Sequence, residues 1–416
     1  MMKKGEEYKG FMVIDVVDVP DASSKGIYLI HKRTGMEIFH LLNDDEENLF
    51  AFAFRTPASD SSGVAHVLEH SVLCGSEHYP LRDVFTRLQN QNITTYLNAY
   101  TSSDRTVFPC STTVKKEYFN LMSVYGDAVF FPLLTSEIFM QECHRLELDE
   151  NGKPCRQGVV YNEMKGNYSS FDGVADSYIE KTLLEGTNYK LDSGGDPMDI
   201  PSLTVQKVRA FHKKHYCPAN CMLFLYGNIP TEEQLLFIDK NFLQHFSSGG
   251  KKISLPKADF STPVKPYVKE KGPASEQSRN DASVSVCAWR VGNGMDKENA
   301  SVFPLEIMFL GDVLWGDDCA PVSKALLESK LGQDIAPQSG ESLQSRYAIM
   351  SIGLRGVEQK DARQMQNLIN ETLKSICRNG IKKEDIDRTC MTFDFSNREI
   401  KRFQGPYSLV LLRRCL

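Results

Sequence analysis

The sequence has no run that approaches the roughly 18 consecutive apolar residues needed to span a bilayer. Its first residues, MMKKGEEYKGF, also lack the apolar segment of a signal peptide. There is no excess of positive charge, because 48 Lys and Arg are set against 54 Asp and Glu for a net charge of -6. A phosphate backbone would therefore find no basic domain to bind. We expect a cytoplasmic protein with no membrane anchor and no nucleic-acid partner.

Cysteines are present but follow no regular pattern. The 11 cysteines are odd in number and are spread from Cys74 to Cys415, whereas disulfide-stapled domains use paired, regularly spaced cysteines. Reduced thiols are the expectation. Cys217 and Cys221, near two histidines, mimic a structural zinc site, but they flank a predicted turn and are more simply small buried residues. The 28 Gly and 18 Pro are scattered, which excludes collagen-like and low-complexity chains.

The 416 residues exceed what one hydrophobic core holds well, so two domains are expected. Short apolar segments bounded by turn residues predict an antiparallel meander over residues 26–55, with further strands at TTYLNAY and CMLFLYGN. Helical patterns cover residues 64–73, 115–129, 158–165 and 205–214. Strands interleaved with helices in this way predict an α+β domain over residues 1–246.

A polar segment with four prolines, residues 247–281, is the predicted linker. Beyond it, VSVCAW and YAIMSIGL are expected strands, and helical patterns cover residues 304–314, 322–331 and 361–379. These predict a second α+β domain over residues 282–416. The chain ends in the apolar run SLVLLRRCL with no turn or cap signal after it, so we expect an element interrupted there and a second domain truncated at its C-terminus.

The clearest chemical motif is HVLEH, residues 66–70. On a helix, His66 and His70 lie one turn apart on one face, so both imidazoles can bind one metal ion. Glu69 lies beside them, where a carboxylate can take a proton from water and return it to a leaving amine. The pattern H-x-x-E-H is the inverse of the H-E-x-x-H zinc-protease motif. Two surface histidines with a solvated Glu are the alternative, and the apolar residues around the motif argue against it.

A zinc site of this kind needs a third protein ligand. Cys74 is excluded because eight residues of helix place it about 12 Å from His66. His144 is a second candidate, but it lies among charged residues and is more simply a surface histidine. Glu163 is the better candidate because it is a single acid in the largely apolar segment GVVYNEMKG, where an unpaired carboxylate is costly. On composition alone, pairing with Lys165 or exposure to solvent would be favoured.

Three segments then occur in order: HVLEHSVLCGSEHYPLRDVF, TYLNAYTSSDRTVFP and GVVYNEMKGNYSS. Together with PVSKALLESKLGQDIAPQSG in the second domain, they closely resemble the pitrilysin-type M16 metallopeptidases, specifically the presequence-protease and falcilysin-like branch. The resemblance implies two tandem M16-type domains, each an antiparallel sheet covered by helices. It also implies one zinc ion bound by His66, His70 and Glu163, with Glu69 as general base.

The same resemblance implies a substrate-binding strand over TYLNAY, with Asn98, Ala99 and Tyr100 contacting the peptide. Such a strand at a sheet edge binds a peptide through main-chain hydrogen bonds, which suits an enzyme of broad specificity. The alternative is an ordinary amphipathic strand.

Members of this branch are about twice as long and enclose their substrate with four domains, the last of which supplies an Arg/Tyr pair. The present sequence matches the first two domains. We therefore expect a zinc-dependent endopeptidase that cuts short unfolded peptides and is completed by a C-terminal M16 half, on the same chain or as a separate subunit. A non-catalytic half that serves assembly is the alternative. A third hypothesis is a lyase resembling the S-ribosylhomocysteine-cleaving enzymes, which are shorter and use a cysteine ligand.

Overall fold

The computed structural model describes residues 2–261, 264–273, 283–293, 302–400 and 405–416. The chain divides into two compact units that interleave in sequence. The first unit contains Met1–Met164, Asp192–Pro256 and Ile400–Leu416, and the second contains Lys165–Leu191 and Lys257–Glu399. The prediction placed one continuous domain after the other, whereas the observed units exchange segments. In the described part of the predicted linker, the backbone forms neither helix nor strand.

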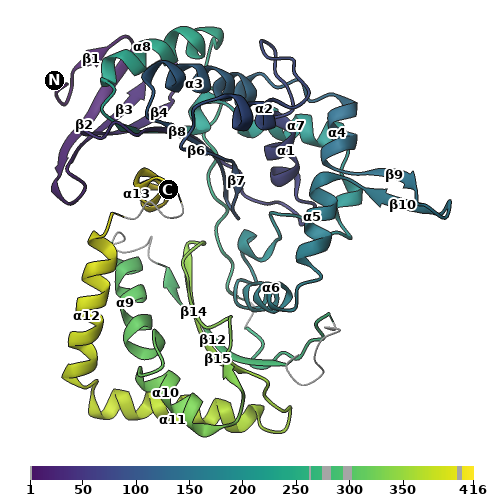
Figure 1. The fold of residues 1–416 in the computed structure, drawn as a ribbon, viewed down its shortest axis with the longest axis vertical. Helices are drawn as coiled ribbons and strands as arrows, with labels where there is room; N and C mark the ends of the chain where they lie inside the picture. Colours follow the sequence, from purple (N-terminus) through teal and green to yellow (C-terminus); the bar gives the residue numbers. More distant parts are fainter. Residues whose placement is uncertain (1, 262–263, 274–282, 294–301, 401–404) are drawn as a thin grey trace. The chain divides into compact units, whose positions relative to one another are not determined.

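The first unit is built on a sheet of nine strands among the described residues, in the order β1-β2-β3-β4-β11-β5-β8-β6, with β7 also paired to β8 (Figure 1). Every pairing is antiparallel except that of β4 with β11. The strands are β1 (Glu7–Tyr8), β2 (Phe11–Val19), β3 (Ser24–His31), β4 (Glu37–Leu42), β5 (Asn48–Arg55), β6 (Tyr96–Leu97), β7 (Tyr100–Thr101), β8 (Arg105–Thr112) and β11 (Cys221–Gly227).

The predicted meander over residues 26–55 is wrong at its second connection. β3 and β4 pair directly, but β11 lies between β4 and β5, parallel to the first and antiparallel to the second. The turn NDDEEN is compatible with either arrangement, so a local pattern does not reveal that a distant strand is inserted there. β2, which was not predicted, pairs with β3 along most of its length.

Four of the first unit's helices lie within two residues of their predicted ranges: α1 (Val64–Val72), α3 (Lys115–Phe130), α5 (Val159–Asn167) and α7 (Val205–His215). Each of these helices has buried apolar residues. Their spacing along the helix is visible in the sequence, so apolar periodicity was sufficient to locate them. The other helices are α2 (Val84–Gln91), α4 (Ser136–Glu142) and α8 (Thr231–Asn241), and a separate hairpin is formed by β9 (Arg145–Leu148) and β10 (Pro154–Gln157). Within α5 the chain passes from the first unit to the second.

β5 is buried on both faces of the sheet from residue 48 to residue 54, which explains the continuous apolar run LFAFAF within it. Successive side chains alternate between faces, so the three phenylalanines form one row. Phe50 contacts Tyr118 of α3 edge-to-face at 5.4 Å between ring centroids, and Phe52 contacts Phe242 at 5.9 Å. The smaller Leu49, Ala51 and Ala53 make the opposite row and belong to a second core cluster.

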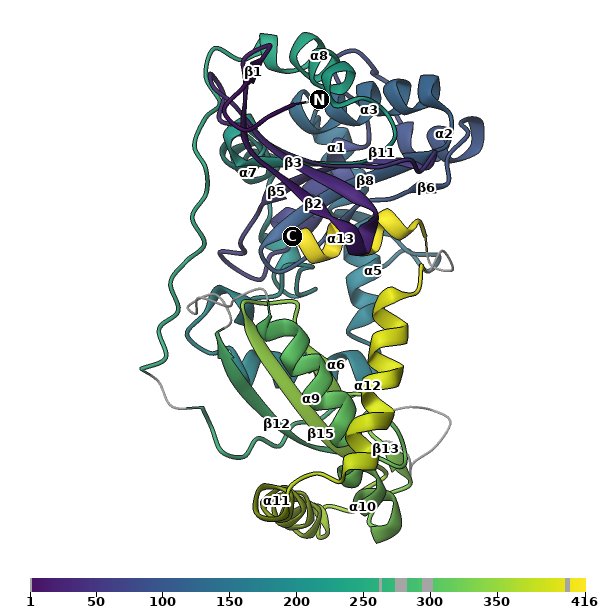
Figure 2. The same ribbon diagram turned by 90° about the vertical axis from the view of Figure 1, so that its left-hand side faces the viewer.

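This second face of the sheet is covered by α13 (Tyr407–Cys415), through buried residues that include Leu409 and Leu412. Figure 2 shows α13 on the side of the sheet away from α3 and α8. The prediction assigned the apolar run SLVLLRRCL to the second domain, but it belongs to the first unit. Packing against the β5 row accounts for its apolar side chains.

The second unit has a sheet of four described strands, and β15 pairs antiparallel with all three others. Its strands are β12 (Val284–Asn293), β13 (Asp334–Ile335), β14 (Gly340–Ser342) and β15 (Tyr347–Arg355), and its helices are α6 (Phe171–Leu183), α9 (Phe303–Trp315), α10 (Pro321–Ser329), α11 (Ala362–Asn379) and α12 (Lys383–Arg398). In the described residues of both units, no helix is long and apolar enough to cross a membrane.

β15, like β5, is buried on both faces of its sheet. Met350, Ile352 and Leu354 pack in a cluster with residues of α9, α10 and α11. Tyr347 and Ile349, which point the other way, pack against Leu183, Leu184 and Tyr189 at and beyond the end of α6. The segment after α5 thus covers a sheet face of the second unit, as α13 covers one of the first. This reciprocal exchange is why the two units interleave in sequence.

We predict that Leu412→Ala lowers the free energy of unfolding of the first unit by about 2–5 kcal/mol, because it leaves a cavity between α13 and the sheet. Leu412 is 0% exposed, whereas Leu146 of β9 is 70% exposed, so Leu146→Ala is the matched control and should change stability by less than about 0.5 kcal/mol. Urea titration of both variants measures the difference. Equal stabilities would contradict the packing of α13.

Candidate metal centre

α1 carries both histidines of the HVLEH motif on a largely buried helix. His66 is 8% exposed and Glu69 is 7% exposed, which rules out the alternative of a solvated Glu69. The residue before the helix is Gly63, with a left-handed φ of 69° and no capping side chain. α1 is therefore held in place by packing rather than by a side-chain cap, and it carries residues 66, 69 and 70 among buried apolar residues of the same helix.

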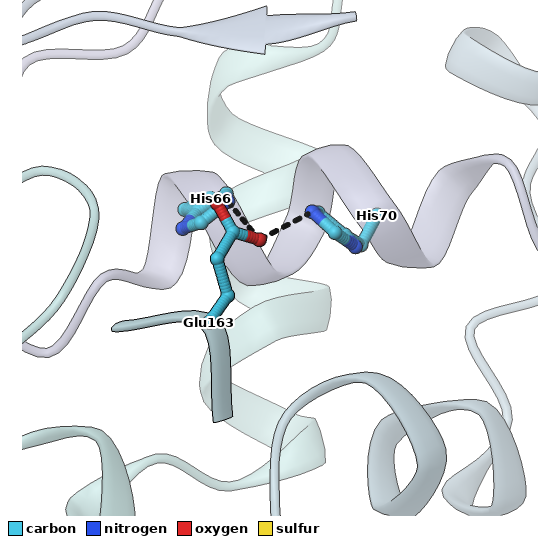
Figure 3. A group of neighbouring side chains, drawn as sticks. All are labelled: His66, His70 and Glu163. Carbon is cyan, nitrogen blue, oxygen red and sulfur yellow. Dashed lines mark ion pairs between the residues drawn. The ribbon is translucent and has the colours of Figure 1, made fainter. Parts of the chain in front are cut away.

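Glu163 of α5 faces both histidines, as Figure 3 shows. Its Oε2 lies 3.7 Å from Nε2 of His66 and 3.7 Å from Nε2 of His70. Ligands bound tetrahedrally at about 2.0–2.1 Å from zinc are about 3.4 Å apart, so these separations fit an ion between the three atoms. In the part of the chain that the structure describes, no other group of His, Cys, Asp and Glu is arranged in this way. We call these three residues the metal centre.

The reason for choosing Glu163 from sequence does not hold, although the residue does reach the metal centre. Its side chain is 47% exposed, and only Val160 and Met164 of α5 are buried. The carboxylate is therefore not an isolated charge in an apolar environment. His66 is buried and His70 is half-buried, whereas Glu163 is exposed on α5. The group of three is therefore open to solvent on the α5 side.

Each histidine is held through its Nδ1 atom, which leaves Nε2 directed at the metal centre. Nδ1 of His66 lies 2.9 Å from the carbonyl oxygen of Gly194, and Nδ1 of His70 lies 3.3 Å from Oε2 of Glu142. An Nδ1–H that donates to these acceptors leaves Nε2 unprotonated and able to bind a metal. Burial lowers the pKa of His70, but the hydrogen bond to Glu142 and the surrounding carboxylates outweigh it, and the pKa is raised.

The loop that carries Gly194 approaches the start of α1 closely. The Asp192 side chain accepts hydrogen bonds from the backbone N–H groups of Gly194 at 2.9 Å and Gly195 at 3.1 Å. A Cβ on Gly63 would lie 2.5 Å from the Gly194 oxygen, nearer than any real Cβ contact. Glycine is therefore required at position 63 both for its φ and for the space that lets the loop reach His66.

Glu69 points to the same region and is held by Thr101 of β7, whose hydroxyl donates to Oε2 of Glu69 at 2.7 Å. Burial raises the pKa of Glu69, while the hydrogen bond from Thr101 and the two histidines partly oppose it. A raised pKa makes the carboxylate a stronger proton acceptor than an exposed glutamate. Thr101 was missed in the sequence because its role depends on β7 lying beside α1.

The predicted substrate strand is interrupted in the structure. β6 and β7 both pair with β8, but Asn98 and Ala99 between them are in neither strand. The Asn98 side-chain oxygen accepts the Ala99 N–H at 2.9 Å, and such a local bond competes with strand pairing. Tyr100 begins β7 and directly precedes Thr101. β6 is the last strand in the sheet order.

The remaining candidate ligands have partners elsewhere. Cys74 donates to Oε1 of Glu142 at 3.4 Å and is not in the metal centre. His144 lies 3.4 Å from the Leu203 carbonyl oxygen through Nε2. Near Cys217 and Cys221, the two histidines also contact backbone carbonyls: His212 that of Val129 at 2.8 Å, and His215 that of Arg55 at 3.0 Å.

Two family models match this chain. Residues 55–162 match the insulinase family, peptidase family M16, and residues 202–393 match the M16 inactive domain. The chain is therefore built from domains of the M16 peptidase family. It is homologous to the presequence proteases: the mitochondrial presequence protease of Xenopus tropicalis is 36% identical over 388 residues, which are 92% of this chain and 37% of that protein. The chain thus spans well under half the length of the curated relatives it matches.

Solved structures show the same fold at low sequence identity. A protease from Helicobacter pylori superposes with a TM-score of 0.68 at 16% identity, over 94% of this chain and 89% of that one. Pitrilysin superposes with a TM-score of 0.67 at 17% identity, over 98% of this chain and 42% of that one. The predicted α+β fold of two M16 domains is confirmed.

We predict that Gly63→Ala weakens zinc binding by about tenfold or more, because displacing the Gly194 loop removes the partner that orients His66. Gly152→Ala is the control: Gly152 also has a positive φ, 74°, but an added Cβ would meet nothing within 4 Å. Both variants thus carry backbone strain, and only the first disturbs the loop. Competition with a chromophoric chelator measures the affinities, and equal losses in both would contradict the role of the loop.

Proposed function

We propose that this chain is the zinc-bearing half of a metalloendopeptidase that hydrolyses short unfolded peptides. The observation that carries the proposal is the approach of Glu163 to both histidine Nε2 atoms at 3.7 Å, with Glu69 buried beside them. Homology to presequence proteases supports a peptidase function. The cytoplasmic location and the activity of the chain by itself stay predictions.

The donor set of the metal centre fits zinc. Two imidazoles and one carboxylate are a common set for a zinc ion that retains an open position for water or substrate. When bound, zinc polarises a carbonyl and lowers the pKa of its water. Glu69 is the general base: it takes a proton from the attacking water and returns it to the leaving amine. Thr101 holds Oε2 of Glu69, so that Oε1 is left for the water.

The peptide is proposed to bind along β6 and β7, with Asn98, Ala99 and Tyr100 supplying main-chain contacts. Two features support this placement. β6 ends the sheet order, and an edge strand has main-chain groups available for a further strand. β7 contains Thr101, which contacts Glu69, so a peptide on this edge would lie beside the general base.

A C-terminal M16 half is proposed to complete the enzyme, because the presequence proteases and pitrilysin are more than twice this length. The second candidate is a non-catalytic half that serves assembly. It is favoured by the match of residues 202–393 to a domain described as inactive. The lyase hypothesis has no comparable support, because Cys74 lies outside the group formed by His66, His70 and Glu163.

We predict that the purified chain binds one zinc ion and that His70→Ala weakens binding by at least about 100-fold. Glu69→Gln should retain zinc but slow peptide cleavage by about 10²–10⁴-fold, because it removes the base and leaves the ligands. Metal analysis measures the bound zinc, and chromatography of the cleavage products of an unfolded peptide measures the rate.

The cleavage assay is run with the chain alone and with an added C-terminal half. Absence of stoichiometric zinc, or binding unaffected by His70→Ala, would contradict the metal centre. Zinc binding without cleavage in either mixture would support the assembly role instead. Cleavage by Glu69→Gln at the wild-type rate would exclude Glu69 as the base.

We also predict that the substrate is bound through its backbone. N-methylation of a peptide amide that pairs with the edge at residues 98–100 should lower kcat/KM by about tenfold, the equivalent of one hydrogen bond. Alanine at the same peptide position, which changes the side chain alone, should have a smaller effect. The opposite ranking would show that side chains rather than main-chain bonds determine binding.

A further inference from the structure

Glu142 is a buried carboxylate beside the metal centre that neither the HVLEH motif nor the proposed mechanism uses. It is the last residue of α4, and its side chain is only 7% exposed. Its Oε2 lies 3.3 Å from Nδ1 of His70. His144, the ligand candidate of this segment in the sequence, contacts the Leu203 carbonyl oxygen, whereas the residue that reaches the site is two positions earlier.

Two side chains, one from α4 and one from the residues after α1, donate hydrogen bonds to the carboxylate of Glu142. Nε2 of Gln141 donates to Oε1 at 2.8 Å, and Sγ of Cys74 donates to the same oxygen at 3.4 Å. Cys74 also contacts the backbone oxygen of His70 at 3.4 Å, so the thiol links the end of α1 to α4. With Oε1 held by these two donors, Oε2 is left to face the His70 ring.

The two histidines are therefore supported differently. His66 is held by a neutral backbone carbonyl, that of Gly194, whereas His70 is held by a carboxylate. Either acceptor can select the ring tautomer, but a carboxylate also increases the basicity of the imidazole and so its strength as a ligand. Burying a charge costs several kcal/mol unless it is compensated; Gln141, Cys74 and the His70 ring supply that compensation for Glu142.

We infer that Glu142 is a positioning residue of the metal centre: it accepts the Nδ1–H of His70, directs Nε2 to the ion and strengthens that ligand. The inference rests on the proposed zinc site. It concerns metal affinity, so it does not depend on whether this chain cleaves peptides by itself.

The test is the zinc affinity of the full chain, measured by competition with a chromophoric chelator. Glu142→Gln keeps the size of the side chain and an oxygen that can accept from Nδ1, but removes the charge. We expect it to weaken zinc binding by about 10–100-fold. Glu137→Gln is the matched control, because Glu137 is an exposed residue of the same helix, and it should bind zinc as the wild type does.

A second measurement follows the hydrogen bond itself. In the zinc-loaded protein labelled with ¹⁵N-histidine, Nδ1–H signals protected from exchange are expected for His66 and His70. Glu142→Ala should lose the His70 signal and keep that of His66, whereas Glu142→Gln should keep both. A general loss of structure would not remove one signal selectively.

The outcomes separate this inference from the proposed function. If His70→Ala weakens zinc binding but Glu142→Gln matches the wild type, the inference is overturned and the zinc site stands. If the wild type binds no zinc, or His70→Ala has no effect, both are overturned. If Glu142→Ala does not fold, the affinity of Glu142→Gln decides the inference.

Discussion

The convergence of His66, His70 and Glu163 is the constraint on which the rest of the site depends. Their ligand atoms lie within 4.8 Å of one another, and Glu69 and Glu142 add two more carboxylates nearby. Like charges this close oppose one another's ionisation, and Glu163 indeed contributes to raising the pKa of Glu69. A cation at the centre relieves that repulsion, which is the physical reason to regard the arrangement as a metal site.

The fold maintains this arrangement by fixing each participant from a different part of the chain. α1 is buried, the Gly194 loop and α4 each hold one histidine, and β7 holds Glu69 through Thr101. The sheet that carries β7 is covered on one face by α3 and on the other by α13. Because both faces are packed, the strands beside α1 have little freedom to move, and the side chains they position share that rigidity.

The site also lies where the chain changes unit. The first stretch of the first unit ends at Met164, immediately after Glu163, and the segment that follows packs in the second unit until Leu191. The chain then returns at Asp192 to form the loop that holds His66. Glu163 and the loop that supports His66 thus lie on either side of one exchanged segment. The same topology interleaves the units and brings these groups together.

The sequence by itself determined the HVLEH helix and the positions of most helices, because periodicity and spacing along one helix are local properties. Glu163 was chosen through the family resemblance, since its apolar neighbours in sequence do not make it a buried charge. Only the tertiary structure decided that β11 separates β4 from β5, that α13 belongs to the first unit and that Glu163 is half exposed rather than buried. It alone brought Gly194, Thr101 and Glu142 to the site. Each of these depends on which distant segments pack together, and a hydroxyl, a carbonyl or a carboxylate gains its role only from the group placed opposite it.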